Sequence, residues 1–240
     1  TVSFFITISN LRLVESLKAS FDTYYGKQLP YSVSILVPAR NEELRIRQCL
    51  EALIAQTDNS IEIIVLDDRS TDQTSNIVYD IIKSDTRAKI IAGSELPDGW
   101  VGKNWACHQL HQEATGDFLL FIDADTILSE GTVVNSLSES IECSVDLLTV
   151  MPRRTANCIA ERLLFPFIDW AVFSWMPMKA AHNSRNPHLS ATFGQFMLFK
   201  RESYETIGGH ESIRGNPFDD FELGRMTKRK GLRWMLFEGA

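Results

Sequence analysis

The chain has 240 residues, of which 44% are hydrophobic, and it carries a formal net charge of -7. A chain of this length and apolar content can bury a sizeable core, so we expect one compact domain. The negative charge argues against a general nucleic-acid-binding protein, because such binding rests largely on lysine and arginine neutralising phosphates, and we expect no nucleic-acid partner.

The four cysteines are scattered and form no C-x-x-C pair. This spacing indicates neither a zinc site nor a disulfide framework. We therefore expect reduced thiols in a cytosolic compartment. The cysteines are Cys49, Cys107, Cys143 and Cys158.

The ends of the chain suggest a segment of a longer protein. The sequence begins at Thr1 instead of a methionine and stops directly after an apolar run at 234–237. The apolar run at 2–8 is far shorter than the roughly 20 residues that span a bilayer. It fits either the end of a membrane helix or an ordinary buried element.

The first half of the chain alternates between strand and helix patterns. Period-two and continuous apolar runs predict strands at 33–37, 61–66, 89–91 and 118–122. Apolar residues at helical spacing predict helices at 44–54, 71–84 and 103–114. Such alternation predicts an α/β fold with a mostly parallel central sheet and helices on both faces. Ligands in these folds bind at the carboxyl ends of the strands.

The pattern is looser in the second half. Strands are predicted at 146–150 and 195–199, and an aromatic-rich helical stretch at 160–180. Two further helices are predicted at 201–207 and 219–230, each followed by glycine.

Two carboxylates, Asp123 and Asp125, directly follow the strand predicted at 118–122. Side chains one residue apart on an extended segment project from the same side, and oxygen ligands open to substrate suit Mg²⁺ or Mn²⁺. The alternative is a turn in which one aspartate caps a helix that begins near Ser129.

A second acidic pair, Asp67 and Asp68, follows the second strand. The pair can accept hydrogen bonds from a nucleobase or a ribose hydroxyl. The structural alternative is pairing with Arg69 and capping of the next helix, because adjacent carboxylates repel each other unless each has a partner.

Two further positions combine charge with a helix start. Lys103 follows Gly102, which allows a ligand to approach the backbone closely, and its charge suits a phosphate. Asp220, after Asp219, is either a plain helix cap or a general base that deprotonates an acceptor hydroxyl.

In this order and spacing, the motifs resemble the family 2 glycosyltransferases, from about Ser32 to the end of the chain. The amino-acid sequence at 97–100 and 123–126 is similar to that of the membrane-associated branch of this family, which is linked with carotenoid or hopanoid lipids. The motifs that carry the resemblance lie at 37–43, 67–72, 102–103, 123–125, 194–197, 208–209 and 219–220.

The resemblance implies a Rossmann-like GT-A fold of the kind that transfers sugars from nucleotide diphosphates. It implies a catalytic domain over 31–240, truncated at its C-terminus, after a flanking segment over 1–30. It also implies a nucleotide pocket in which Asp68 contacts the nucleobase and Lys103 supports the nucleotide. The pocket residues are Pro38, Ala39, Arg40, Glu42, Asp67, Asp68, Lys103 and Asp123.

The same resemblance implies Mg²⁺ or Mn²⁺ held by Asp125 with Asp123, and Asp220 as the catalytic base. Asp219 stands where the family has glutamate, which shortens one side chain beside that base. The expected reaction is an inverting transfer from a nucleotide-diphosphate sugar, with a UDP-sugar favoured.

The acceptor is expected to be a lipid or another hydroxyl compound at the cytoplasmic face of a membrane. Aromatic residues are dense over 165–178, and such surfaces suit a bilayer. A helix packed in the protein core is the alternative. Two other functions remain open, a nucleotidyltransferase and a non-catalytic nucleotide-sugar binding module.

Overall fold

The structure is a computed structural model that describes residues 3–10, 31–56, 60–153 and 158–239. The predicted boundary between residues 30 and 31 lies at the edge of one of these ranges and is not tested. Within the described residues, no helix combines the length and the apolar character needed to cross a bilayer.

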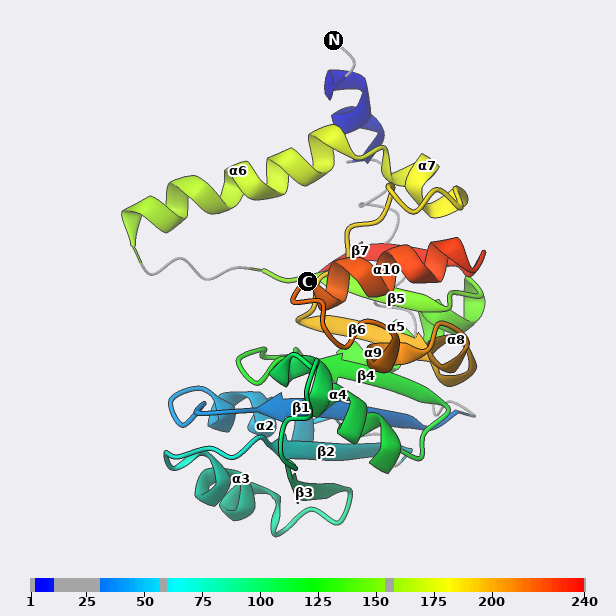
Figure 1. The fold of residues 1–240 in the computed structure, drawn as a ribbon. Helices are drawn as coiled ribbons and strands as arrows, with labels where there is room; N and C mark the ends of the chain where they lie inside the picture. The colour runs from blue at the N-terminus through cyan, green and yellow to red at the C-terminus, as the bar shows by residue number, and fades with distance from the viewer. Residues whose placement is uncertain (1–2, 11–30, 57–59, 154–157, 240) are drawn as a thin grey trace.

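In the described part of the chain, seven strands form one sheet in the order β3-β2-β1-β4-β6-β5-β7 (Figure 1). Neighbouring strands run parallel except that β6 is antiparallel to both β4 and β5. The strands are β1 (Val33–Ala39), β2 (Ile61–Asp67), β3 (Ala88–Ala92), β4 (Phe118–Ile122), β5 (Leu147–Met151), β6 (Phe196–Lys200) and β7 (Trp234–Glu238).

Helices cover both faces of the sheet. Side chains of α2, α3 and α5 join one buried cluster, and side chains of α4, α7, α8 and α10 join the cluster on the other face. The helices are α2 (Ile46–Ile54), α3 (Thr74–Ile82), α4 (Gly102–Glu113), α5 (Thr132–Glu142), α6 (Ile159–Trp175), α7 (Met178–Asn183), α8 (Arg201–Thr206), α9 (Gly209–Ser212) and α10 (Asp219–Arg229). The predicted fold class is thus confirmed.

The alternating direction of side chains along the central strands explains why there are two buried clusters. In β4, Leu120 packs into the cluster under α2, α3 and α5, whereas Leu119 and Phe121 pack into the cluster under α4. Successive strand side chains point to opposite faces, so a strand covered on both faces must be apolar throughout. This requirement is why β4 is buried at every position.

Several predicted elements have different bounds in the structure. The helical stretch predicted at 160–180 is divided near Pro177 into α6 and α7, since proline fixes its own φ and provides no N–H donor. The helix predicted from residue 44 begins at Ile46, and Leu44 is exposed. Helix α9 and strand β7 were not predicted, and a helix near α5 was named only in the alternative in which an aspartate caps a helix that begins near Ser129. The structure starts α5 at Thr132, after Gly131, with no side-chain cap.

Helix α6 extends away from the sheet, and the helical residues 3–10 lie beside its C-terminal end (Figure 1). The Asn10 amide fixes this junction by donating to the carbonyl oxygens of Phe173 and Met176, each at 2.7 Å. Its side-chain oxygen accepts from the Met178 N–H at 3.0 Å. The N-terminal helix and the break between α6 and α7 are therefore held together by polar contacts.

A buried histidine makes the stability of the fold depend on pH. His182 in α7 accepts a hydrogen bond from the Leu236 N–H of β7 at 3.2 Å, and burial, with Lys228 nearby, lowers its pKa to about 4. Because the unfolded chain takes up this proton near pH 6.5, stability is complete above that pH and is lost as the pH falls towards 4. The loss amounts to roughly 3 kcal/mol.

We predict that His182→Gln flattens the decline in unfolding free energy between pH 6.5 and 4. Urea unfolding at a series of pH values measures this slope. His188→Gln alters an exposed histidine and serves as the control, which should keep the slope of the parent. Equal slopes for His182→Gln and the parent would contradict the assignment.

Candidate active site

A cavity of about 400 Å³ opens at the carboxyl ends of β1, β2 and β4. The first turn of α4 closes one side of it. It brings together nearly all of the predicted nucleotide and metal residues; Asp67 and Asp220 do not line it. The lining residues are Pro38, Ala39, Arg40, Glu42, Asp68, Gly102, Lys103, Ala106, Asp123, Ala124 and Asp125.

Asp67 stabilises the turn after β2. Its Oδ1 accepts a hydrogen bond from the Ser70 N–H at 3.1 Å. Asp68 is buried in the cavity wall and faces Arg40, with 3.4 Å between its Oδ2 and the arginine Nη1. The two adjacent carboxylates thus have different partners, and Asp68 is the one that faces the cavity.

The loops after β1 and β2 are joined by side-chain hydrogen bonds. The Asn41 Oδ1 accepts from the Thr71 N–H at 2.8 Å, and the Glu42 N–H donates to Thr74 Oγ1 at 2.8 Å. Asn41 and Arg69 have φ values of 55° and 56°, a conformation rarely adopted by residues other than glycine. These contacts fix the backbone that carries Arg40, Glu42 and Asp68 to the cavity.

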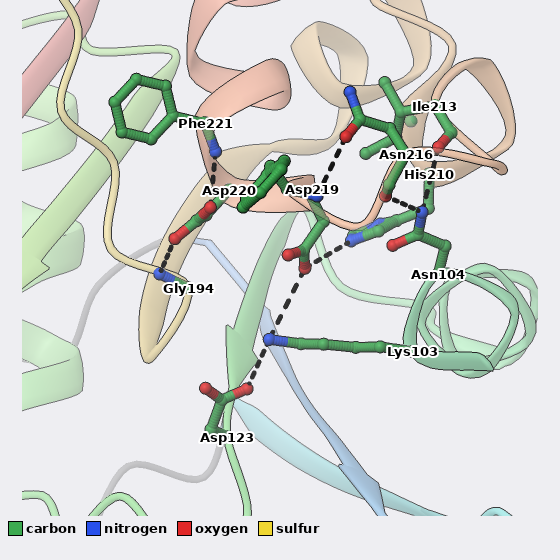
Figure 2. Close-up of polar contacts among 12 residues, drawn as sticks. Lys103, Asn104, Asp123, Gly194, His210, Ile213, Asn216, Asp219, Asp220 and Phe221 are labelled. Atoms are coloured by element: carbon green, nitrogen blue, oxygen red, sulfur yellow. Dashed lines mark hydrogen bonds and ion pairs between the residues drawn. The ribbon is translucent and has the colours of Figure 1, made fainter. Parts of the chain in front are cut away.

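Lys103 forms ion pairs with two carboxylates, and Figure 2 shows its ammonium group between them. Its Nζ lies 2.8 Å from Asp123 Oδ1 and 3.5 Å from Asp219 Oδ2. Burial alone lowers the pKa of Lys103, but the two carboxylates outweigh it and hold the pKa above the ordinary lysine value. Burial raises the pKa of Asp123, despite the opposing effect of Lys103.

Asp125 is more open to solvent and pairs with Arg45, with 3.3 Å between the carboxylate Oδ2 and the arginine Nη1. The charge of Asp125 also acts on Glu42. The pKa of Glu42 is raised mainly by burial and next by the negative charge of Asp125. The side of the cavity around these carboxylates is therefore rich in negative charge.

The donor set fits a divalent cation shared with a bound substrate. Asp123 and Asp125 supply hard oxygen ligands at the cavity wall, where Mg²⁺ or Mn²⁺ typically bridges carboxylates and phosphates. Among the described residues, no group of three or more histidine, cysteine, aspartate or glutamate side chains is arranged to hold a metal by itself. A cation here would complete its coordination with substrate and water oxygens.

Asp220 is the second residue of α10, and its carboxylate is held by two backbone amides (Figure 2). Its Oδ1 accepts from the Phe221 N–H at 2.7 Å, and its Oδ2 accepts from the Gly194 N–H at 3.2 Å. Burial, and then the charge of Asp219, raises the pKa of Asp220 against the opposing effect of the amides. A raised pKa improves a carboxylate as a proton acceptor near neutral pH.

Gly194 connects Asp220 with the cavity. A Cβ atom at this position would lie 3.3 Å from Lys103 Nζ and 3.5 Å from Asp220 Oδ2. The ammonium group that pairs with Asp123 and the carboxylate of Asp220 therefore face the same small space. Asp220 does not line the cavity, but both its carboxylate and the lining residue Lys103 lie next to Gly194.

A second cavity, of about 370 Å³, shares Asp125 with the first. Its wall combines one arginine, Arg153, with polar groups such as Gln195 and with apolar side chains. The lining residues are Asp125, Thr126, Ile127, Leu128, Ser129, Thr132, Val150, Pro152, Arg153, Gln195, Phe196 and Gly239.

Sequence reasoning missed three contributors to the site: Arg45, Asn104 and the pairing of Asp219 with Lys103. Asn104 and Arg45 look like surface helix residues, and no sequence pattern separates them from such residues. Asp219 carried a signal, its position beside Asp220, but its partner is distant in sequence and becomes visible only in the fold.

Comparison with known proteins identifies relatives over most of the chain. The family described as "Glycosyl transferase family 2" matches residues 34–208. The 4,4'-diaponeurosporenoate glycosyltransferase of Staphylococcus haemolyticus is 27% identical over 224 residues, which covers 92% of this chain and 58% of the relative. The Staphylococcus aureus protein of the same name is 29% identical over 212 residues, covering 87% and 54%. The chain thus spans little more than half the length of these relatives.

Solved structures share the fold at low sequence identity. A mannosyltransferase from Pyrobaculum calidifontis, in complex with GDP-Man and Mn²⁺, has a TM-score of 0.68 at 19% identity and covers 100% of this chain and 68% of its own. Glucosyl-3-phosphoglycerate synthase from Mycobacterium tuberculosis, in complex with Mn²⁺, UDP and glucosyl-3-phosphoglycerate, has a TM-score of 0.58 at 20% identity, with coverages of 94% and 73%. The predicted GT-A fold is confirmed by these neighbours.

We predict that Lys103→Met lowers the unfolding free energy by about 1–3 kcal/mol, because it leaves Asp123 and Asp219 without their shared cation. Adding Asp219→Asn should recover part of the loss, since one of the two facing charges is then removed. Urea unfolding at neutral pH measures both effects.

Lys89→Met is the control, because Lys89 pairs with Glu113 at an exposed position and such pairs contribute about 0–1 kcal/mol. A Lys103→Met variant no less stable than Lys89→Met would contradict the structural role of the pairing of Lys103 with Asp123 and Asp219.

Proposed function

The chain belongs to glycosyl transferase family 2, and we propose that it transfers a sugar from a nucleotide-diphosphate donor to an acceptor at a membrane surface. Membership of a glycosyltransferase family confirms the enzyme class predicted from the motifs. One observation carries the proposal. Lys103 lines the same cavity as Asp123 and Asp125, and its ammonium group and the carboxylate of Asp220 both lie next to Gly194.

The donor would bind in the cavity of about 400 Å³. Asp68 and Arg40 lie together at one wall, where carboxylate and guanidinium groups suit the base and ribose. Lys103 also lines this cavity, and its positive charge is suited to the diphosphate. The solved neighbours bind UDP or GDP-Man, and a UDP-sugar is our first choice of donor for this chain.

Asp125 and Asp123 would hold Mg²⁺ or Mn²⁺, which when bound offsets negative charge on the departing nucleoside diphosphate. Lys103 adds a fixed positive charge at the same place. Because it already pairs with Asp123 and Asp219, its position is set before the donor arrives. Glu42 and Arg45 surround Asp125 and tune the charge of this wall.

Asp220 would act as the base in a single displacement. A hydroxyl oxygen of the acceptor attacks the anomeric carbon as its proton passes to Asp220, and the bond between that carbon and the diphosphate oxygen breaks on the opposite face. The configuration of the sugar is inverted, and no covalent sugar–enzyme intermediate forms. The raised pKa of Asp220 and its fixed orientation support this role.

An apolar acceptor is supported by the surface of α6. Among the described side chains of this helix, five large apolar ones are exposed, namely Leu163, Leu164, Phe167, Trp170 and Trp175. On a helix with 100° per residue these positions share one side, the pattern of a helix that lies in a bilayer interface. We propose that this side contacts the cytoplasmic face of a membrane, where a lipid acceptor would be found.

The curated relatives are named for 4,4'-diaponeurosporenoate, which by its name is a carboxylate. A carboxylate acceptor carries no proton to be removed, so Asp220 would matter less for it than for a hydroxyl. Arg153 in the second cavity has the fork geometry that binds carboxylates. Comparison of hydroxyl and carboxylate acceptors with the Asp220→Asn variant separates the two classes.

We predict that Asp125→Ala abolishes metal-supported binding of the donor, whereas Asp220→Asn retains donor binding and loses transfer to hydroxyl acceptors. Calorimetry with Mn²⁺ measures binding, and release of the nucleoside diphosphate measures transfer. Asp80→Asn, an exposed change on α3, should alter neither quantity.

Equal donor affinity in Asp125→Ala and the parent would overturn the metal assignment. Full transfer to hydroxyl acceptors by Asp220→Asn would overturn the base. Metal-dependent donor binding with no transfer by the parent to any acceptor would instead favour a binding module, and release of diphosphate from a nucleoside triphosphate would favour a nucleotidyltransferase.

We predict that the double variant Phe167→Ser with Trp170→Ser weakens binding to liposomes of phosphatidylglycerol and phosphatidylcholine by about tenfold, because it removes apolar area from α6. Flotation measures the bound fraction. Tyr79→Ser removes an exposed aromatic ring on α3 and should leave binding unchanged. Equal flotation of all three proteins would contradict the role of α6.

A further inference from the structure

The first turn of α4 contacts the donor cavity and the loop that carries Asp220 through adjacent residues. Lys103 lines the cavity, whereas Asn104 does not. We propose that Asn104 and Asp219 are positioning residues that dock the loop at 213–219 onto α4 and so set the place of Asp220 relative to the donor. The inference rests on the proposed function, because it assigns these residues to the same reaction.

Asn104 is 1% exposed and makes its contacts with main-chain oxygens of the loop (Figure 2). Its Nδ2 donates to the carbonyl oxygens of Asn216 at 2.8 Å and Ile213 at 3.0 Å, with the Arg214 oxygen at 3.3 Å. The Val101 N–H, one turn earlier, donates to the same Arg214 oxygen at 2.7 Å. An irregular loop between two helices thus satisfies its carbonyl groups on α4.

Asp219 supplies the second contact between the loop and α4. Its side chain is 9% exposed, and its Oδ2 lies 3.5 Å from Lys103 Nζ. The same oxygen lies 4.0 Å from Nε2 of His210, a residue of α9. Figure 2 shows the carboxylate between these two groups. Asp219 therefore joins α4 and α9 at the first residue of α10.

The protonation state of the His210 ring follows from its hydrogen-bond partners and its burial. The Tyr204 hydroxyl accepts from the His210 main-chain N–H at 3.0 Å, so its own proton is free to be donated to Nδ1, 2.6 Å away. Burial lowers the pKa of His210 to about 3, and the ring is neutral. The remaining ring proton then sits on Nε2, the nitrogen that faces Asp219.

The contacts of Asn104 and Asp219 fix the backbone that leads directly to Asp220. Asn216, whose carbonyl oxygen is bound by Asn104, accepts the Phe218 N–H on its side-chain oxygen at 2.9 Å. Asp219 is fixed next, and Asp220 follows it with its carboxylate turned to Gly194. A displacement of about 1 Å at a reacting group can cost about a hundredfold in rate, so small shifts of this loop should impair transfer.

The decisive variant is Asn104→Ala, which removes the contacts to the loop without changing a residue that lines the donor cavity. We expect donor affinity within about threefold of the parent and a transfer kcat lower by about tenfold or more. Asn76→Ala, on the exposed side of α3, is the matched control and should keep both values.

Asp219 is tested by a pair of variants. Asp219→Asn removes the charge that pairs with Lys103 and should lower kcat in the same way, whereas Asp219→Glu keeps the charge and should restore a large part of it. If Asn104→Ala does not fold, this pair alone decides the inference. A kcat unchanged in Asp219→Asn, or equally reduced in Asp219→Asn and Asp219→Glu, would overturn the positioning role.

Hydrogen exchange provides a readout that does not depend on activity. Main-chain amides of 213–221 should exchange faster in Asn104→Ala than in the parent, while those of β1 and β4 remain unchanged. Unchanged exchange over 213–221 would overturn the docking. If the parent transfers sugar to no acceptor, the proposed function fails by itself, and the exchange result still decides whether Asn104 holds the loop.

Discussion

Lys103 places one positive charge between two carboxylates that come from distant parts of the chain. Asp123 follows β4 in the centre of the sheet, and Asp219 begins α10 in the C-terminal part. Without a cation between them, two partly buried carboxylates would repel each other and separate the donor cavity from the loop that carries Asp220. The geometry of the site therefore depends on this pairing. It also means that a residue suited to binding phosphate has a structural role before any ligand is present.

The topology of the sheet explains how the remaining groups reach the same edge. The parallel strands β1, β2 and β4 all end there and carry Arg40, Asp68 and Asp123 with them. Strand β6 runs in the opposite direction, and its first residue, Phe196, pairs with Ile122 at the end of β4. The start of β6 thus lies at the edge where its neighbours end. This reversal brings Gly194 beside Lys103 and Asp220, a placement that a parallel strand would not give.

Part of the cavity was predictable because Arg40, Asp68 and Asp123 follow strands whose apolar pattern is clear. The carboxyl ends of parallel strands converge, so Asp68 and Asp123 were expected to share a cavity, and they do. The pairing of Asp219 with Lys103 and the contacts of Asn104 were not predicted, because they join segments more than 100 residues apart and no local pattern records such contacts. The break at Pro177 was missed because an aromatic-rich run at helical spacing hid the effect of the proline.

The most direct test of the account is calorimetric titration of the parent chain with UDP-, GDP- and dTDP-sugars, each with and without Mn²⁺. We predict that one nucleotide class binds and that its binding requires the metal, because the diphosphate would enter the cavity lined by the carboxylates of Asp123 and Asp125. Binding of no nucleotide sugar by a folded chain, or binding that is equally strong without Mn²⁺, would contradict it.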